Sequence, residues 1–179
     1  CICNPGDEVI LPTPCYVSYA DQIRLSGGSP VFVPTSEERN FRLCAEDIHP
    51  FLNERTKAVV VNSPNNPTGA VCSETDLREI AALSEERGFL VVTDEVYEHL
   101  LYDGLRHVSF ASLGEDAKRR TITVNSLSKT YAMTGWRIGF AGGPAPIIGA
   151  MAKLQGHVSG NVNAMTQKAA IEALRGPQD

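Results

Sequence analysis

Residues 58–69 read Ala-Val-Val-Val-Asn-Ser-Pro-Asn-Asn-Pro-Thr-Gly, a short apolar run followed at once by a polar turn. The run Ala58–Val61 is apolar at successive positions, which is typical of a central strand covered by helices on both faces. The turn, Ser63–Gly69, holds two prolines, two asparagines and a glycine, all of which favour tight turns. Such a turn is more often structural than functional, so by itself it indicates only where the strand ends.

Short β-branched runs of this kind alternate with longer stretches of helical period, and Gly, Pro or Asn marks each switch. This alternation predicts an α/β domain with three layers, in which helices cover both faces of a mostly parallel sheet. The expected strands are Glu8–Leu11, Pro30–Val33, Ala58–Asn62, Phe89–Thr93, Thr121–Asn125 and Arg137–Ala141. The expected helices are Tyr16–Leu25, Ala45–Leu52, Ser73–Arg87, Pro146–Leu154 and Ala164–Leu174.

The clearest of these helices is the one over Ser73–Arg87. Ser73 is a good N-cap, Asp76 follows three residues later as in a capping box, and Gly88 is placed to end the helix. The apolar residues of this segment recur on one face, which we expect to be buried.

The composition argues against several classes of protein. The 179 residues carry a formal net charge of −5 and one basic cluster, Lys118–Arg120, which disfavours a nucleic-acid partner. Apolar runs such as Phe89–Val92 fall well short of the ~20 residues that cross a bilayer, and the opening Cys-Ile-Cys lacks the pattern of a signal peptide. Five cysteines at irregular spacings indicate reduced thiols. We therefore expect a cytoplasmic protein without a membrane span or a metal site.

Three further polar groups stand at the ends of expected strands, where open α/β sheets bind ligands. Thr93–Tyr97 closes one strand and places Asp94 at its mouth, where a carboxylate needs a cation or a donor. Asn125–Thr130 closes the next strand and brings Lys129, which in an enclosed cleft would be a free amine able to form an imine. A Gly-Trp-Arg stretch then places Arg137 between two glycines, with room for an anion.

Each group taken alone has a plainer interpretation. Asp94 is also suited to cap a helix, and a Gly-Trp-Arg stretch in isolation means little. His49, before Pro50, indicates a helix boundary. The remaining histidines have no motif support and are interpreted as structural or surface residues: His99, His107 and His157.

Together these groups resemble the fold-type I, pyridoxal 5′-phosphate (PLP)-dependent aminotransferases of class I/II, in particular their aspartate-aminotransferase-like subgroup. The resemblance covers essentially the whole chain, in the family's order and spacing. The motifs that carry it are Asn4–Val9, Pro14–Tyr19, the Asn-Pro-Thr-Gly turn at 66–69, Asp94-x-x-Tyr97, Ser126-x-Ser128-Lys129 and Gly135–Gly139.

The resemblance implies catalytic roles for three residues. Lys129 would hold PLP as a Schiff base and move a proton between substrate and cofactor. Asp94 would pair with the pyridinium nitrogen and keep it protonated. Tyr97, together with Asn66, would donate hydrogen bonds to the phenolic oxygen of the cofactor.

Three more residues are implied as cofactor ligands. Ser126 and Arg137 match phosphate ligands, the first through its hydroxyl and the second through a two-point guanidinium contact. Tyr16 matches an aromatic residue that stacks on the pyridine ring, and it fits equally a core tyrosine at the start of a helix.

The same resemblance implies that residues 1–179 are the central part of the large PLP-binding domain, without its N-terminal segment and without the C-terminal small domain. The substrates would be an amino acid, aspartate-like by subgroup, and a 2-oxo acid. The full-length protein would be a homodimer, and the isolated chain is expected to be inert.

Two alternatives stay open. One is a PLP-dependent carbon–sulfur lyase of the same fold, and the other is a non-catalytic, aminotransferase-like sensory domain of a transcription regulator. The stretch Tyr131–Arg137 is more similar to the aminotransferase branch.

Overall fold

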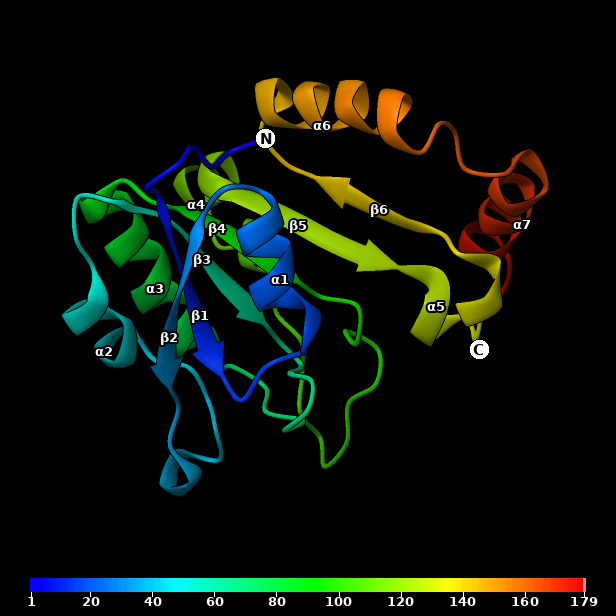
Figure 1. Ribbon diagram of the computed structural model, residues 1–179. Coiled ribbons are helices and arrows are strands. Elements are labelled where there is room, and N and C mark those ends of the chain that lie inside the picture. Colours follow the sequence, from blue (N-terminus) through cyan, green and yellow to red (C-terminus); the bar gives the residue numbers. More distant parts are fainter. Residues whose placement is uncertain (179) are drawn as a thin grey trace.

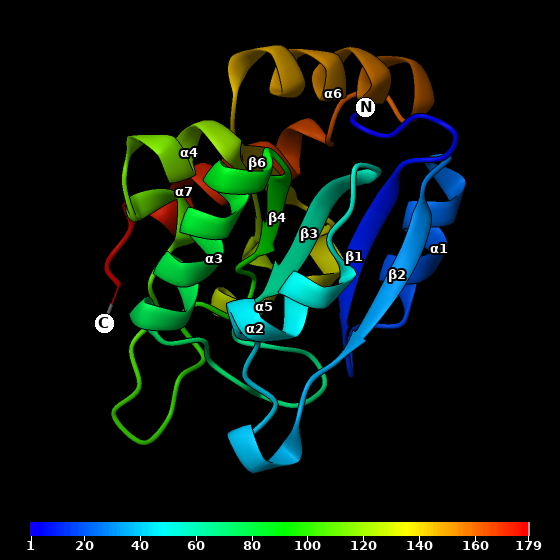
Figure 2. The same cartoon turned by 90° about the vertical axis from the view of Figure 1, so that its left-hand side faces the viewer.

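The computed structural model describes residues 1–178, in which six strands form one sheet (Figures 1 and 2). Asp179, the last residue of the expected domain, lies outside this part. The strands are β1 (Glu8–Thr13), β2 (Ser29–Pro34), β3 (Thr56–Asn62), β4 (Leu90–Asp94), β5 (Thr121–Ser126) and β6 (Gly139–Gly142). The α-helices are α1 (Ser18–Leu25), α2 (Ala45–Ile48), α3 (Glu74–Arg87), α4 (Glu115–Arg120), α5 (Leu127–Thr130), α6 (Ala145–Val158) and α7 (Ala164–Arg175). Short 3₁₀ turns cover Glu37–Arg39, His49–Phe51, Phe110–Ser112 and Thr134–Trp136.

The strands follow the order β2-β1-β3-β4-β5-β6, and all neighbours are parallel except β5 and β6. The chain changes direction across the sheet after β2, because β2 lies on one side of β1 while β3, β4 and β5 follow on the other. Open sheets of this kind bind ligands at the carboxyl ends of the strands beside such a switch. The predicted α/β class and mostly parallel sheet are confirmed.

Each face of the sheet has its own core, because successive residues of a strand point to opposite sides. Ile10 and Val59 pack on the side covered by α2, α3 and α4. Leu11 and Val60 pack on the opposite side, which α1 covers through Ile23. The two views show α1 and α3 on opposite sides of the strands (Figures 1 and 2). The three predicted layers are therefore present, and the layer formed by α1 is short.

The predicted caps of α3 are confirmed. The Ser73 Oγ accepts a hydrogen bond from the Asp76 N–H at 3.1 Å, and the Asp76 carboxylate accepts one from the Ser73 N–H at 2.8 Å. Gly88 ends the helix with a φ of 78°, in the left-handed region that favours glycine. Leu77 and Ile80 are buried on the face turned to the sheet.

Several predicted boundaries are wrong. α1 begins at Ser18, so Tyr16 precedes the helix. α2 ends at Ile48 and continues as a 3₁₀ turn, because Pro50 lacks the N–H that an α-helix needs. The sequence does not predict α4 and α5, since helices of six and four residues are too short for a periodic apolar signal.

The last expected strand, Arg137–Ala141, begins too early. Arg137 has a left-handed φ of 54° and ends the 3₁₀ turn, and β6 starts at Gly139. β6 runs antiparallel to β5, with Gly139 opposite Ser126. The beginning of β6 therefore lies at the same edge of the sheet as the end of β5.

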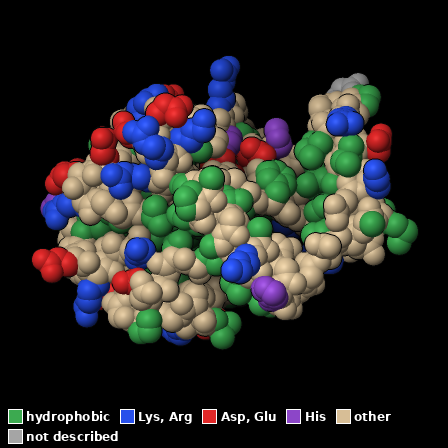
Figure 3. All heavy atoms as spheres, turned by 90° about the horizontal axis from the view of Figure 1, so that it is seen from above, with side chains coloured by type: hydrophobic (Ala, Val, Ile, Leu, Met, Phe, Trp, Pro, Cys, Tyr) green, Lys and Arg blue, Asp and Glu red, His purple; other side chains and the backbone are tan. Residues whose placement is uncertain are grey.

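The surface carries charge of both signs. On the face shown in Figure 3, acidic and basic side chains are interspersed. The basic cluster Lys118–Arg120 forms the end of α4, where Lys118 lies 3.8 Å from Glu115 and Arg119 pairs with Asp116. Within residues 1–178, every helix is too short or too polar to span a lipid bilayer.

The substitution Gly139→Ala tests whether the close approach of β6 to β5 requires a glycine at this position. An alanine Cβ at this position would lie 2.9 Å from the Asn125 carbonyl oxygen, so one of the two strands would have to shift. We expect Gly139→Ala to lower the free energy of unfolding, measured in urea, by about 1–3 kcal/mol, a typical cost of overpacking. Gly142→Ala is the matched control, because no described atom lies within 4 Å of its Cβ. Equal losses in the two variants would contradict this explanation.

Candidate active site

The carboxyl ends of β3, β4 and β5 lie side by side, since the strands are parallel and Asn62 is paired with Asp94, and Asp94 with Val124. A cavity of about 300 Å³ opens at this edge. Its lining consists of Tyr16, Tyr19, Asn62, Asn66, Asp94, Val96, Tyr97, Ser126, Ser128, Lys129, Thr134 and Arg137. The fold thus brings together all seven residues that the resemblance implies: Tyr16, Asn66, Asp94, Tyr97, Ser126, Lys129 and Arg137.

Asn62 holds the turn that carries Asn66. Its Oδ1 accepts a hydrogen bond from the Asn66 N–H at 2.8 Å. Its Nδ2 donates to the carbonyl oxygens of Pro64 at 3.1 Å and Asp94 at 3.0 Å. One amide group therefore ties the turn to the ends of two neighbouring strands. Asn62 is a site residue that the sequence marks only as the end of a strand.

Asp94 ends β4 with its carboxylate at the cavity. The Oδ2 atom accepts a hydrogen bond from the Tyr19 hydroxyl at 2.6 Å, and Oδ1 accepts one from the Val96 N–H at 3.2 Å. The residues after Asp94 form a turn and not a helix, so its interpretation as a helix cap is wrong. Burial and the negative charge of Asp94 raise the pKa of Tyr19 far above its ordinary value, so the phenol remains the donor.

A buried carboxylate anchors the loop that presents Tyr97. Glu95 is only 4% exposed and accepts hydrogen bonds from the Ser109 hydroxyl at 3.2 Å and the Phe110 N–H at 3.1 Å. The His107 Nε2 lies 3.1 Å from its other oxygen. Burial by itself would raise the pKa of Glu95, but the hydrogen bonds from His107 and Ser109 outweigh it and hold the pKa below its ordinary value. The interpretation of His107 as a structural residue agrees with this contact.

Glu98 extends the same anchor toward β5. Its Oε1 accepts a hydrogen bond from Asn125 Nδ2 at 2.6 Å. One ligand atom each from Glu95, Glu98 and His107 lies within 4.8 Å of the others. These three groups already hold the loop through contacts with other protein groups. The expectation that the protein has no metal site stays a prediction.

Ser126 caps α5, the single turn that carries Lys129. The Ser126 Oγ accepts a hydrogen bond from the Ser128 N–H at 3.1 Å and donates to the Ile138 carbonyl oxygen at 2.8 Å. The second bond ties the start of α5 to the segment that leads into β6. Leu127 of α5 is buried in a cluster with Ala170 of α7, so α7 supports this helix from behind.

Lys129 and Arg137 are exposed. The enclosed cleft expected around Lys129 is therefore wrong for the described part of the chain, because a one-turn helix at the rim of the sheet leaves the side chain uncovered there. The Lys129 Nζ lies 5.5 Å from the centroid of the Tyr97 ring. The Arg137 Nη1 donates a hydrogen bond to the Thr134 carbonyl oxygen at 2.9 Å, which holds the guanidinium beside its own turn.

The charges of the cavity are free to act on a ligand. Among the ion pairs within residues 1–178, none involves Asp94, Lys129 or Arg137. The arrangement can bind an anion through Arg137 and Ser126 and a cationic group through Asp94, with a primary amine in the same cavity.

Known proteins share both the sequence and the fold of this chain. The model of the family "Aminotransferase class I and II" matches residues 1–179. An aspartate aminotransferase from Bacillus sp. (strain YM-2) is 48% identical over 178 residues, which are 99% of this chain and 45% of that relative.

Two solved structures show the same likeness in three dimensions. An aromatic aminotransferase from Pyrococcus horikoshii OT3 has a TM-score of 0.95 at 47% identity, covering 98% of this chain and 47% of that chain. An aspartate aminotransferase from Thermus thermophilus with maleate has a TM-score of 0.93 at 45% identity, covering 97% and 44%. The chain spans a little under half the length of these relatives. Since the family model matches from the first residue to the last, the chain belongs to the class I and II aminotransferases.

Proposed function

We propose that the full-length protein is a PLP-dependent aminotransferase, which transfers an amino group between an amino acid and a 2-oxo acid. Family membership supports the reaction. The observation that carries the proposal is the convergence of seven residues, far apart in the sequence, on one cavity at the carboxyl edge of the sheet. The proposal concerns the full-length product, because the chain spans under half the length of its relatives.

The donor set of the cavity fits the chemical groups of PLP. The phosphate dianion matches Arg137 and Ser126, and the pyridine nitrogen, when protonated, matches the carboxylate of Asp94. The phenolic oxygen matches the side chains of Asn66 and Tyr97. When bound, PLP supplies an electron sink that stabilises negative charge at the α-carbon of the substrate.

Lys129 supplies the reactive amine in this proposal. Its ε-amine would hold the aldehyde group of the cofactor and, when released, would carry the proton at the substrate α-carbon. The Tyr97 ring, 5.5 Å from the Lys129 Nζ, presents a π face that attracts the ammonium form. Tyr16, which lines the same cavity, provides an aromatic surface for the pyridine ring.

Asp94 holds the proton on the ring nitrogen. Its two oxygens already accept hydrogen bonds from Tyr19 and Val96, so the carboxylate keeps one orientation before any ligand arrives. An anion fixed in this way stabilises the positive charge of the protonated nitrogen.

The proposals for substrate, assembly and location rest on the relatives and on composition, and not on the geometry of the cavity. An aspartate-like amino donor is supported by the aspartate aminotransferases among the relatives. Aromatic amino acids are a second class of donor to test, because one similar structure is an aromatic aminotransferase from Pyrococcus horikoshii. We propose a homodimer, from family membership, and a cytoplasmic location, which fits the five unpaired cysteines.

Incubation of the full-length product with aspartate and 2-oxoglutarate is expected to produce glutamate, and alanine and aromatic donors complete the panel. Cysteine belongs in the same panel, and its consumption with release of pyruvate, ammonia and sulfide, without glutamate, would replace the proposal by a carbon–sulfur lyase. Binding of PLP without turnover of any donor would favour the sensory domain.

Lys129→Ala is expected to abolish the absorbance band of covalently held cofactor. It should also lower turnover by roughly 10²–10⁴-fold, the range typical of a lost acid–base group. The matched control is Lys118→Ala, at the exposed end of α4, which should keep the wild-type spectrum. Identical spectra for the two variants would refute the assignment of Lys129.

Arg137→Gln separates the phosphate contact from the rest of the site. A hydrogen bond to a charged group contributes about 1.5–3 kcal/mol, so we expect the dissociation constant of PLP to rise by roughly 10–100-fold. Binding of pyridoxal, which lacks the phosphate, should not change. Arg137→Lys keeps the charge but loses the planar two-point contact. Its dissociation constant for PLP should therefore lie between those of the wild type and Arg137→Gln. An equal loss of affinity for both compounds would show that Arg137 does not bind the phosphate.

A further inference from the structure

We propose that Tyr19 is a positioning residue, which holds the Asp94 carboxylate in the orientation that binds the cofactor ring. This inference rests on the proposed function and deepens it. Tyr19 is the last residue of the motif Pro14–Tyr19, but the resemblance implies no role for it, and its hydroxyl reaches Asp94 across 75 positions of the sequence.

The contact between the two side chains is short and charge-assisted. The Tyr19 hydroxyl lies 2.6 Å from Asp94 Oδ2, within the range of strong O–H···O⁻ bonds. The second oxygen of Asp94 accepts from the Val96 N–H at the longer distance of 3.2 Å. Two donors from different parts of the chain, α1 and the turn after β4, therefore hold the carboxylate plane.

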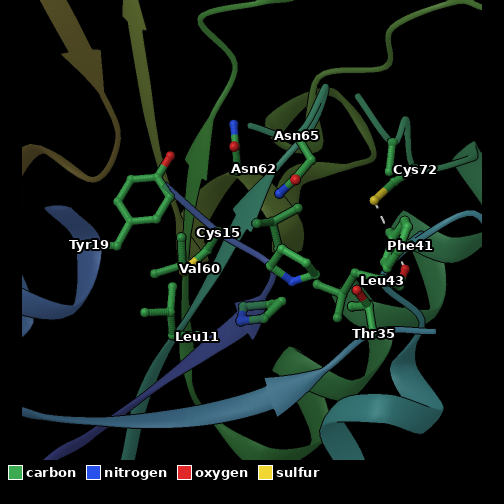
Figure 4. A pocket seen from close by; sticks show the side chains of 14 residues that line it. Leu11, Cys15, Tyr19, Thr35, Phe41, Leu43, Val60, Asn62, Asn65 and Cys72 are labelled. Atoms are coloured by element: carbon green, nitrogen blue, oxygen red, sulfur yellow. Dashed lines mark hydrogen bonds between the residues drawn. The ribbon is translucent and has the colours of Figure 1, made fainter. Parts of the chain in front are cut away.

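Tyr19 is itself held by its surroundings. Its ring packs against the buried cluster of Val9, Leu11 and Val60 on the α1 side of the sheet. Figure 4 shows Tyr19 at one end of a small cavity of about 20 Å³, with Phe41, Leu43 and Cys72 toward the other end. A phenol fixed at both its ring and its hydroxyl can impose an orientation on its partner.

The protonation of Tyr19 supports its role as the donor. Burial, followed by the charge of Asp94, raises the pKa of Tyr19 far above its ordinary value. The phenol therefore keeps its proton and remains the donor in this bond.

Tyr19 also contacts the aromatic residue proposed to face the cofactor. The rings of Tyr16 and Tyr19 meet edge to face, with centroids 5.6 Å apart and an angle of 77° between their planes. Because Tyr16 lies outside α1, this contact is one that restrains its ring. One side chain of α1 thus touches both the anion and the aromatic surface of the site.

A double-mutant cycle tests the proposal. Tyr19→Phe keeps the ring and removes only the hydroxyl, and Asp94→Ala removes the group on which that hydroxyl acts. We expect Tyr19→Phe to raise the dissociation constant of PLP about tenfold, equivalent to about 1.4 kcal/mol. In the Asp94→Ala background the same substitution should leave the dissociation constant unchanged. Tyr102→Phe, whose ring is 73% exposed, is the matched control.

The outcomes separate the inference from the function on which it rests. An equal effect of Tyr19→Phe in both backgrounds, or a loss of unfolding free energy in the cofactor-free protein with an unchanged dissociation constant, would give the bond a purely structural role and overturn the inference. A wild-type protein that does not bind PLP would instead overturn the proposed function.

Discussion

The amide group of Asn62 joins the parts on which the rest of the site depends. It accepts from the Asn66 N–H and donates to the Asp94 carbonyl oxygen, so one side chain links the turn after β3 to the end of β4. The parallel register that pairs Asn62 with Asp94 places the two residues side by side for this contact. A slip of β3 by one residue would turn the Asn62 side chain to the opposite face of the sheet.

The antiparallel pairing of β6 has a similar effect at the other end of the edge. Parallel strands bring only their carboxyl ends to this edge, whereas an antiparallel neighbour brings its beginning. Arg137, two residues before β6, therefore meets the end of β5, and the Ser126 hydroxyl bonds to the Ile138 carbonyl oxygen between them. A site that binds an anion and holds an amine can thus be assembled from two consecutive segments of the chain.

The sequence predicts the strands and long helices well because apolar period and turn residues are local signals, as in α3 with Ser73 and Gly88. The seven cavity residues follow from motifs, and the fold brings all of them to one place. The roles of Tyr19 and Asn62 are missed because they depend on contacts that the fold creates. The hydroxyl of Tyr19, for example, bonds to a residue 75 positions away. The exposure of Lys129 is missed for the same reason. Whether a side chain is covered depends on which segments pack around it in space, and its neighbours in the sequence do not determine this.

The two border strands of the sheet differ in their capacity to accept another strand. In β2 the N–H groups of Ser29 and Thr35 point to β1, so the even-numbered positions face outward, and two of these are Pro30 and Pro34. Proline has no N–H to donate, which leaves β2 with little to offer an approaching strand. β6, Gly-Phe-Ala-Gly, has neither proline nor charge, and Phe140 is 51% exposed. Growth of the sheet by strand addition is therefore blocked on the β2 side and chemically open on the β6 side.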